Sequence, residues 1–127
     1  ERDIRQLAGI HRRKYEFEKS RYYINKQITF FNKKSRSDKL IMAYNDRANI
    51  EYLVGDYNKS TDNYLQVQKH AKIASDYYQE ILANIRIANN YIEINELEIA
   101  ILGCYIPLYS SNIISNASSN WYVLVIT

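Results

Sequence analysis

The most constraining feature of this 127-residue chain is an internal repeat with a period of about 40 residues. Three sets of residues recur at this interval: Ala8, Ala48 and Ala88; Phe17, Tyr57 and Leu97; and Ser20, Ser60 and Ala100. Each copy has a small residue, a further turn or two of helix, an aromatic residue or Leu, and a second small residue. This order describes two helices joined by a tight turn. A period of roughly 20–50 residues with helical content is typical of stacked helical repeats.

The composition agrees with long helices. The chain has only three Gly and one Pro, which argues against a β-sandwich rich in turns. Its hydrophobic fraction of 46% and charged fraction of 24% are ordinary for a folded domain. Because the first residue is Glu rather than Met, we expect a piece of a longer chain.

The second copy of the repeat is the clearest. Ser37 or Asp38 is expected to cap its first helix. Gly55 is expected to supply the left-handed residue at which a helix ends. Asp56 follows it, where a carboxylate favours the amide end of the next helix.

The third copy repeats this design with different residues. Asp76 and Gln79 form a capping pair, and Asn95 replaces Gly55 at the predicted turn. The buried stripe of its first helix is expected at Ile81, Ile85, Ala88 and Ile92. In its second helix Leu97, Ala100, Ile101 and Cys104 are expected to face inward.

The sequence therefore predicts an all-α fold of about three helix pairs stacked in a right-handed superhelix. The pairs are expected at about residues 1–34, 36–74 and 75–106. Pro107 ends or kinks the last helix, since it lacks an amide donor. Residues 107–127 are expected to form an irregular tail outside the repeat.

The segment from Gly55 to Val67 resembles the second helix of a tetratricopeptide repeat, and Ala48 matches that family's small residue in the first helix. The period departs from the family's, which is about 34 residues. Arg47 and Glu51 replace apolar residues of the family and are expected to pair with each other. Longer repeats of this kind are similar to those of Gram-positive regulators that respond to secreted peptides, the Rgg, PlcR and Rap types.

The resemblance implies a binding site on the concave face, which the first helix of each pair lines. The residues that it places there are Asn45, Asn49 and Tyr52 from the second copy, and Ile85, Arg86, Asn89 and Ile92 from the third. Amide side chains suit an extended peptide, because each one donates and accepts a hydrogen bond. Arg86 suits a carboxylate, including the C-terminus of a peptide. The alternatives are that Asn49 and Asn89 bond neighbouring helices and that Arg86 is a solvated charge.

Catalysis and metal binding are not expected, so no catalytic residue, metal ligand or cofactor is assigned. His11, His70 and Cys104 lack the spacing of metal ligands. Cys104 is expected to be an inert core thiol, and the chain has no Gly-rich phosphate loop.

On these grounds we expect the chain to recognise a short peptide or protein segment as part of a bacterial regulator. One cysteine and no long apolar run favour the cytoplasm and no membrane partner. The alternatives are a structural dimerisation or scaffold domain, with a homodimer as one form, and nucleic-acid contact through Arg12, Arg13 and Lys14. The net charge of +3 is weak, so nucleic-acid contact is the less favoured alternative.

Overall fold

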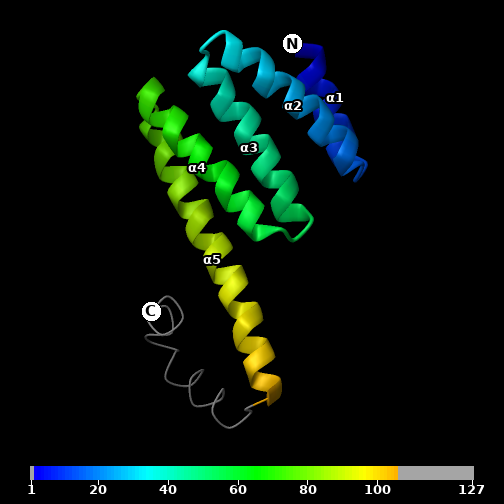
Figure 1. Ribbon diagram of the computed structural model, residues 1–127, viewed down its shortest axis with the longest axis vertical. Coiled ribbons are helices and arrows are strands. Elements are labelled where there is room, and N and C mark those ends of the chain that lie inside the picture. The colour runs from blue at the N-terminus through cyan, green and yellow to red at the C-terminus, as the bar shows by residue number, and fades with distance from the viewer. Residues whose placement is uncertain (1, 106–127) are drawn as a thin grey trace. The chain divides into compact units, whose positions relative to one another are not determined.

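The computed structural model describes residues 2–105, with side chains from residue 3 to residue 96 (Figure 1). Within this range every regular element is an α-helix, which confirms the predicted all-α class. The helices are α1 (Arg2–Arg13), α2 (Phe17–Lys33), α3 (Ser37–Leu53), α4 (Tyr57–Ala74) and α5 (Tyr77–Tyr105). The predicted tail at 107–127 and the predicted inner face of Leu97, Ala100, Ile101 and Cys104 lie outside the residues or side chains described.

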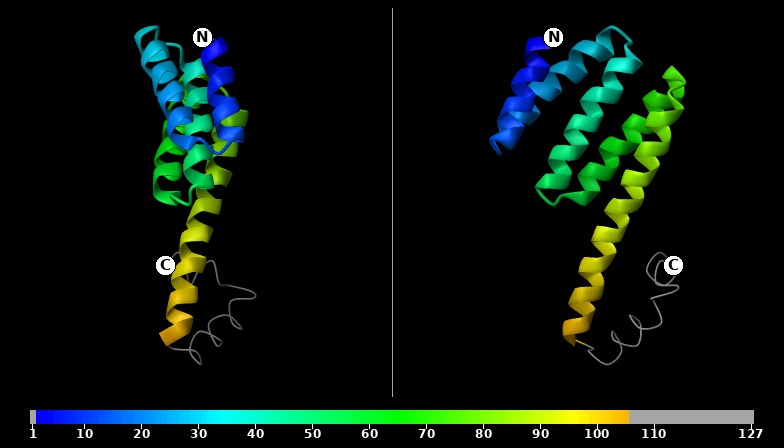
Figure 2. Two further views of the ribbon diagram at one scale, coloured as in Figure 1. Left: turned by 90° about the vertical axis from the view of Figure 1, so that its right-hand side faces the viewer. Right: turned by 180° about the vertical axis from the view of Figure 1, so that it is seen from behind.

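The chain divides into two compact units, residues 1–88 and residues 89–127. In the first unit α1 and α2 form one helical hairpin, and α3 and α4 form a second (Figures 1 and 2). The two hairpins meet where α2 packs against α3. In the second unit the described part is the continuation of α5 to Tyr105.

Four connecting turns share one geometry. Each contains a residue with positive φ: Tyr15 at 59°, Ser35 at 51°, Gly55 at 84° and Ser75 at 54°. In each turn the next amide donates to the carbonyl five residues earlier, as in Asp56 N to Glu51 O at 2.9 Å. This is the Schellman arrangement, which satisfies carbonyls at the end of a helix. Because these residues are 20 positions apart, the 40-residue repeat contains two similar helix-and-turn units.

The starts of the helices agree only partly with prediction. Asp56 accepts a hydrogen bond from the Lys59 amide at 3.1 Å, and Asp76 accepts one from the Gln79 amide at 3.2 Å, as the sequence predicts. The cap expected at Ser37 or Asp38 is wrong, because Arg36 is the N-cap residue and its side chain makes no capping bond. Asp38 instead accepts two bonds from the Arg36 guanidinium, which lower its pKa to about 2.

The repeat is visible in the core as a duplicated hydrogen bond. Ser20 Oγ donates to the Ala8 carbonyl at 2.8 Å, and Ser60 Oγ donates to the Ala48 carbonyl at 2.9 Å. All four residues are at most 3% exposed. Small side chains here allow the two helices of a hairpin to approach closely, which is the physical reason for their recurrence.

The turn predicted at Asn95 is wrong, because α5 runs without interruption from Tyr77 to Tyr105. Asn tolerates the left-handed conformation, but it does not require it. The surrounding residues, Glu-Ile-Asn-Glu-Leu-Glu-Ile-Ala from position 93, contain several good helix formers. The third copy therefore forms one long helix where a helix pair was expected.

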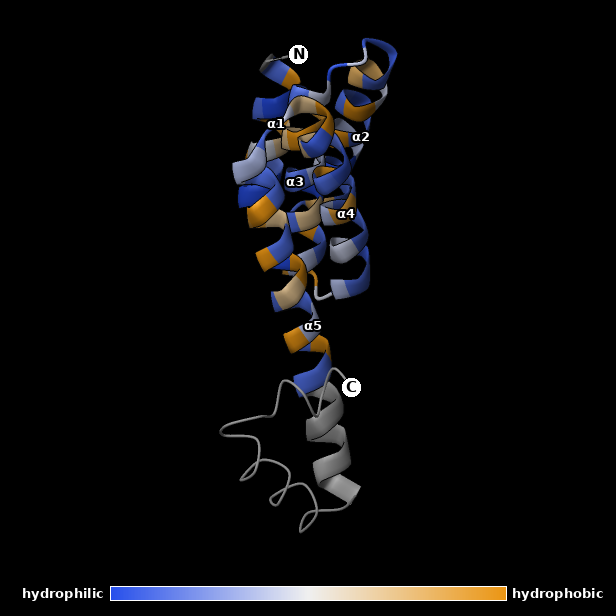
Figure 3. Ribbon diagram, turned by 90° about the vertical axis from the view of Figure 1, so that its left-hand side faces the viewer, coloured by the Kyte–Doolittle hydropathy of each residue, from blue (hydrophilic) through white to orange (hydrophobic). Residues whose placement is uncertain are grey.

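The predicted buried stripe of α5 is also wrong. Ile81 is 60% exposed and Ile85 is 52% exposed, whereas Ala83 is 1% exposed. Ile87 packs against the core from the same side as Ala83, four residues away. Figure 3 shows hydrophobic and hydrophilic residues interspersed along the helices. Hydropathy alone therefore did not identify which side of α5 is buried.

Polar side chains connect the two hairpins. Arg21 of α2 donates two hydrogen bonds to the Glu51 carboxylate of α3, from Nε to Oε1 at 2.6 Å and from Nη2 to Oε2 at 3.3 Å. The bonding to Glu51 raises the pKa of Arg21. Arg47 donates to Asn63 at 2.7 Å and to Asn25 at 2.8 Å. The pairing expected between Arg47 and Glu51 is therefore replaced by contacts that reach other helices.

Candidate functional site: a groove between α1 and α3

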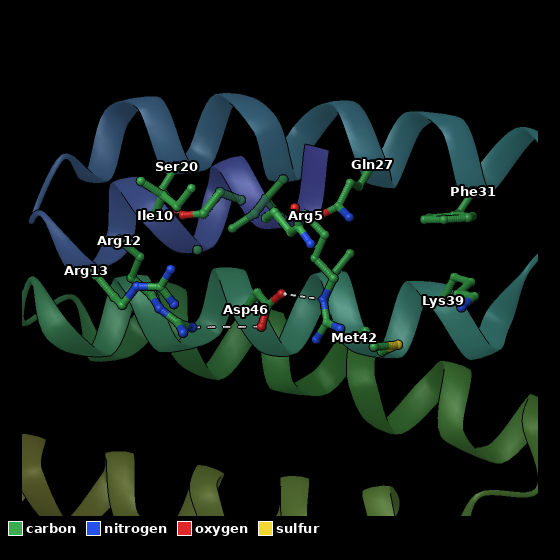
Figure 4. Close-up of a pocket in the computed structure, with 15 residues that line it drawn as sticks. Arg5, Ile10, Arg12, Arg13, Ser20, Gln27, Phe31, Lys39, Met42 and Asp46 are labelled. Carbon is green, nitrogen blue, oxygen red and sulfur yellow. Dashed lines mark hydrogen bonds and ion pairs between the residues drawn. The ribbon is translucent and has the colours of Figure 1, made fainter. Parts of the chain in front are cut away.

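A cavity of about 850 Å³ lies between α1 and α3, with α2 at its base (Figure 4). We call it the α1–α3 groove. Its volume is in the range of ligand-binding pockets. Its lining comes from three helices: Arg5, Gln6, Ala8, Gly9, Ile10, Arg12 and Arg13 of α1; Ser20, Ile24, Gln27 and Phe31 of α2; and Lys39, Met42, Ala43 and Asp46 of α3.

The base of the groove is mainly apolar. Ile24 and Phe31, both at most 3% exposed, lie on one side of α2 because they are seven residues apart. Met42 and Ala43 of α3 adjoin them. The Ser20 hydroxyl adds no free donor there, since it already donates to the Ala8 carbonyl.

The walls of the groove are strongly cationic. Arg5, Arg12 and Arg13 of α1 and Lys39 of α3 face a single acidic residue, Asp46. The Asp46 carboxylate lies 3.5 Å from Arg5 Nε and 3.9 Å from Arg12 Nη1. Both distances exceed those of good charge-assisted hydrogen bonds, which are about 2.7–2.9 Å.

The raised pKa of the Asp46 carboxyl agrees with this weak pairing. Burial raises the pKa of its carboxyl above the ordinary value of 3.8, although Arg5 and Arg12 act in the opposite direction. Desolvation therefore outweighs the two guanidinium groups. The arginines retain hydrogen-bonding capacity for another anion.

Gln27 is the unusual polar residue of the groove. It is 4% exposed, and its Oε1 atom has no hydrogen-bond partner within the described part of the chain. Figure 4 shows Arg5, Gln27 and Asp46 reaching into the same space from α1, α2 and α3. An unpaired buried acceptor is costly, so one beside a cavity suggests that a donor from a ligand satisfies it.

The predicted site residues of α3 lie near this groove but not in its lining. Asn49 is half-buried and stands three residues after Asp46, so helical spacing places it on a neighbouring part of the same side. Asn45 donates from Nδ2 to Gln79 Oε1 of α5 at 3.0 Å. Tyr52 is 38% exposed, and its ring packs edge-on against Tyr57 at 5.4 Å.

The predicted site residues of α5 differ in how exposed they are, and Arg86 contacts a neighbouring helix. Ile85 and Asn89 are exposed, and Ile92 is half-buried. Arg86 lies against α4, with Nη1 3.5 Å from the Tyr64 hydroxyl and its guanidinium carbon 5.6 Å from that ring. Arg86 thus contacts a neighbouring helix, and the structure does not bring it into the α1–α3 groove.

Sequence reasoning missed Arg5, Gln27 and Asp46 as candidate site residues. One signal was available: Gln27 interrupts a stripe on α2 that is otherwise formed by Ile24, Ile28 and Phe31. A polar residue on a buried helix face needs a partner. The position of α1 opposite α3, which makes the groove, is not encoded in any local pattern.

The described residues contain no cluster of three His, Cys, Asp or Glu side chains arranged to hold a metal ion. Nor is any described helix both long enough and apolar enough to cross a membrane. Comparison of the chain with protein-family models, with curated proteins and with solved structures found no match.

Proposed function

We propose that this chain is a helical-repeat binding module that recognises a short peptide or protein segment on the side formed by α1 and α3. The observation that supports this most strongly is the α1–α3 groove of about 850 Å³, with cationic walls and an apolar base. An extended peptide offers apolar side chains, amide donors and anionic groups, and the groove has complements for all three.

Part of the site predicted from the sequence, the residues of α3, lies beside this groove and supports the same proposal. Asn49 lies one helical turn beyond Asp46, so a peptide that leaves the groove along α3 would next meet its amide. Asn45 and Tyr52 stand on either side of it in the sequence. The resemblance to peptide-responsive bacterial regulators supports the same class of ligand, a right-handed superhelical arrangement and a cytoplasmic setting.

Selection from a displayed random-peptide library tests this function. The protein and the double variant Arg12→Glu, Lys39→Glu are used as separate baits, with Lys14→Glu as a control outside the groove lining. We expect enriched peptides that bind the protein and the Lys14 variant and lose binding to the double variant. Failure to enrich any sequence, or equal binding to all three baits, would contradict the proposal.

A second candidate is an association domain that binds another protein through α5. Four large residues near the start of this helix are at least 52% exposed: Tyr77, Tyr78, Ile81 and Ile85. A cluster of exposed apolar side chains often marks a protein interface. Light scattering tests it: a mass that rises with concentration and falls in Ile81→Glu, Ile85→Glu would favour association.

A further inference from the structure

The side of α2 that faces away from the core carries aromatic and basic side chains in alternation. The buried residues of this helix, among them Ile24 and Phe31, lie on its opposite side. None of the exposed set lines the α1–α3 groove, so these residues form a separate surface. We call this surface the α2 strip, and its members are Lys19, Tyr22, Lys26, Phe30, Lys33 and Lys34.

The two exposed rings of the strip have the same surroundings. Tyr22 is 55% exposed, and its ring meets the half-buried ring of Tyr23 edge-on at 5.3 Å. Phe30 is 44% exposed, and its ring meets the buried ring of Phe31 edge-on at 5.2 Å. Each exposed ring is therefore held by the inward-facing aromatic residue that follows it. The two rings are eight residues apart, which is about 12 Å along the helix axis.

Each exposed ring also has a lysine four residues further along the chain. Lys26 Nζ lies 4.5 Å from the centroid of the Tyr22 ring, and Lys34 Nζ lies 5.1 Å from that of the Phe30 ring. Among the residues that the structure describes, no carboxylate forms an ion pair with Lys26, Lys33 or Lys34. These three cations are available to an anionic partner.

The charge of the chain is concentrated around this surface. Of the 17 Lys and Arg residues, 12 lie in the first 39 residues, which hold only 5 of the 14 Asp and Glu residues. The net charge of +3 for the whole chain therefore understates the positive charge of the first hairpin.

The fold itself does not require the α2 strip. The second hairpin keeps the core hydrogen bond of the first, since Ser60 donates to Ala48 as Ser20 donates to Ala8. The exposed side is different: the positions equivalent to Tyr22, Lys26, Phe30 and Lys33 hold Asp62, Gln66, His70 and Ile73. The alternation of rings and lysines is thus a property of one hairpin, which indicates binding rather than packing.

A surface that alternates rings with cations matches a ligand that alternates flat groups with anions. A single nucleic-acid strand has this pattern, because its unpaired bases stack on aromatic side chains and its phosphates bind lysines. A duplex keeps its bases stacked inside, so only the lysines could contact it. An anionic membrane takes up a continuous apolar face, whereas here Lys26 separates the two rings.

We propose that the α2 strip binds single-stranded nucleic acid. Bases stack on Tyr22 and Phe30, and the phosphates beside them contact Lys26, Lys33 and Lys34. The lysine over each ring turns to the adjoining phosphate when a base takes its place. Stacking and phosphate contacts read no base edge, so the preference for sequence is weak. This inference is independent of the proposed peptide function, because the strip and the groove share no lining residue.

Fluorescence anisotropy tests the binding of a labelled strand. The probes are a twelve-nucleotide single strand of mixed sequence, made as DNA and as RNA, and the DNA duplex of the same sequence. We expect at least one single strand to bind about fivefold tighter than the duplex or more. Its affinity should fall about 20-fold between 50 and 200 mM salt, as three phosphate contacts require. Binding of neither strand, or equal binding of strand and duplex, would overturn the inference.

Phe30→Leu tests stacking, because it keeps an apolar side chain and removes the ring. We expect it to weaken single-strand binding about fivefold or more and to leave duplex binding unchanged. The matched control is Tyr78→Leu, which removes a ring that is 72% exposed outside the strip and should change binding less than about twofold. Equal affinity of Phe30→Leu and the unaltered protein would show that no base stacks on this ring.

Lys33→Gln tests the phosphate contacts separately. We expect it to weaken the strand and the duplex alike and to reduce the slope of log affinity against log salt by about 0.7 for the strand. The control is Lys69→Gln, which removes the same charge at an exposed position of α4 and should leave the slope unchanged. An equal change of slope in both variants would contradict the assignment of Lys33.

Co-sedimentation with vesicles of phosphatidylserine and phosphatidylcholine distinguishes a membrane from a nucleic acid. We expect no sedimentation of the protein at the salt concentration where the strand binds. Sedimentation that persists in Phe30→Leu, without binding of either strand, would assign the strip to a membrane surface and overturn the inference. Circular dichroism melting verifies that each variant folds, which the exposure of these side chains leads us to expect.

Discussion

At the scale of single residues, backbone conformation explains why the turns recur at fixed intervals. Tyr15, Ser35, Gly55 and Ser75 all have positive φ, between 51° and 84°. Only Gly adopts this conformation without a steric cost, which is about 1 kcal/mol for other residues. The cost at the other three positions is offset by the carbonyls that the turn satisfies.

Substitutions at two of these turns should have opposite effects. Ser75→Gly should raise the free energy of unfolding by about 0.5–1 kcal/mol because it removes the strain at φ 54°, and Gly55→Ser should lower it by about 1 kcal/mol. Urea denaturation measures both. The control is Lys69→Gly, at an exposed position inside α4, which should destabilise the protein. A stabilising Gly55→Ser would show that the turn geometry is wrong.

Gln27 gives a second prediction at this scale. Replacing this residue, which is 4% exposed, by Leu should raise the free energy of unfolding by about 1 kcal/mol, because an unsatisfied acceptor is removed and an apolar side chain of similar size takes its place. A chemical denaturation series compares it with Gln27→Ala, which should be destabilising because it leaves a void. Similar losses in both variants would mean that Gln27 Oε1 has a partner within the protein.

Individual residues were more predictable from the sequence than their partners. Gly55, Asp56 and Asp76 act through the local backbone, so their roles could be predicted from neighbouring residues. Arg47 and Glu51 were expected to pair because they are four positions apart. Their actual partners lie on other helices, at a sequence separation that no local rule addresses.

At the scale of helices, the most buried ion pair between the two hairpins joins Arg21 to Glu51. The Glu51 side chain is 6% exposed, and Arg21 of α2 is its bonded partner. Truncating Arg21 would leave a buried carboxylate without this partner, and such losses are among the larger effects of single substitutions.

Arg21→Ala should therefore lower the free energy of unfolding by about 2–3 kcal/mol, somewhat less than for a fully buried pair because the Arg21 side chain is 23% exposed. Equilibrium denaturation gives the value. The matched control is Glu18→Gln: Glu18 also contacts Arg21 but is 90% exposed, so its loss should change stability by less than about 0.5 kcal/mol. Equal effects of the two substitutions would show that Glu51 does not depend on Arg21.

Helix boundaries were predictable wherever a turn residue imposed them. The ends of α2 and α4 agree with the predicted boundaries of the pairs, and the end of α3 agrees with the turn predicted at Gly55, while α5 continues through Asn95. A repeat pattern indicates where a turn can form, but the choice between a turn and a continuous helix depends on the contacts made by both halves. The groove was not predictable for a related reason, since it depends on how α1 lies opposite α3.

At the scale of the whole molecule, the loss of folding stability in acid should depend on the protonation of His70. Its ring stacks on Tyr44 at 5.7 Å, and burial lowers its pKa below the ordinary value of 6.5, with Lys69 acting in the same direction. The unfolded chain therefore takes up a proton at this residue before the folded protein does. The stability associated with neutral His70 is present above about pH 6.5 and is lost as the pH falls toward the lowered value.

We expect the thermal midpoint to fall between pH 7 and pH 5, and His70→Phe to reduce this dependence while keeping an aromatic ring against Tyr44. Calorimetry at several pH values measures both profiles. Asp46 acts in the opposite sense, because its raised pKa makes the folded protein gain stability as the pH falls. The difference between the protein and His70→Phe isolates the histidine, and parallel profiles would contradict this assignment.

The central claim is that the α1–α3 groove is the ligand-binding surface of this molecule. Its most direct test is an NMR titration of the labelled protein with the peptide most enriched from the displayed random library, following the Nε–H signals of Arg5 and Arg12 and the side-chain amide of Gln27. The account predicts saturable shifts of these three signals and of the backbone amides of α1 and α3 around them. Shifts centred instead on Ile81 and Ile85 of α5, with the groove signals unchanged, would contradict it.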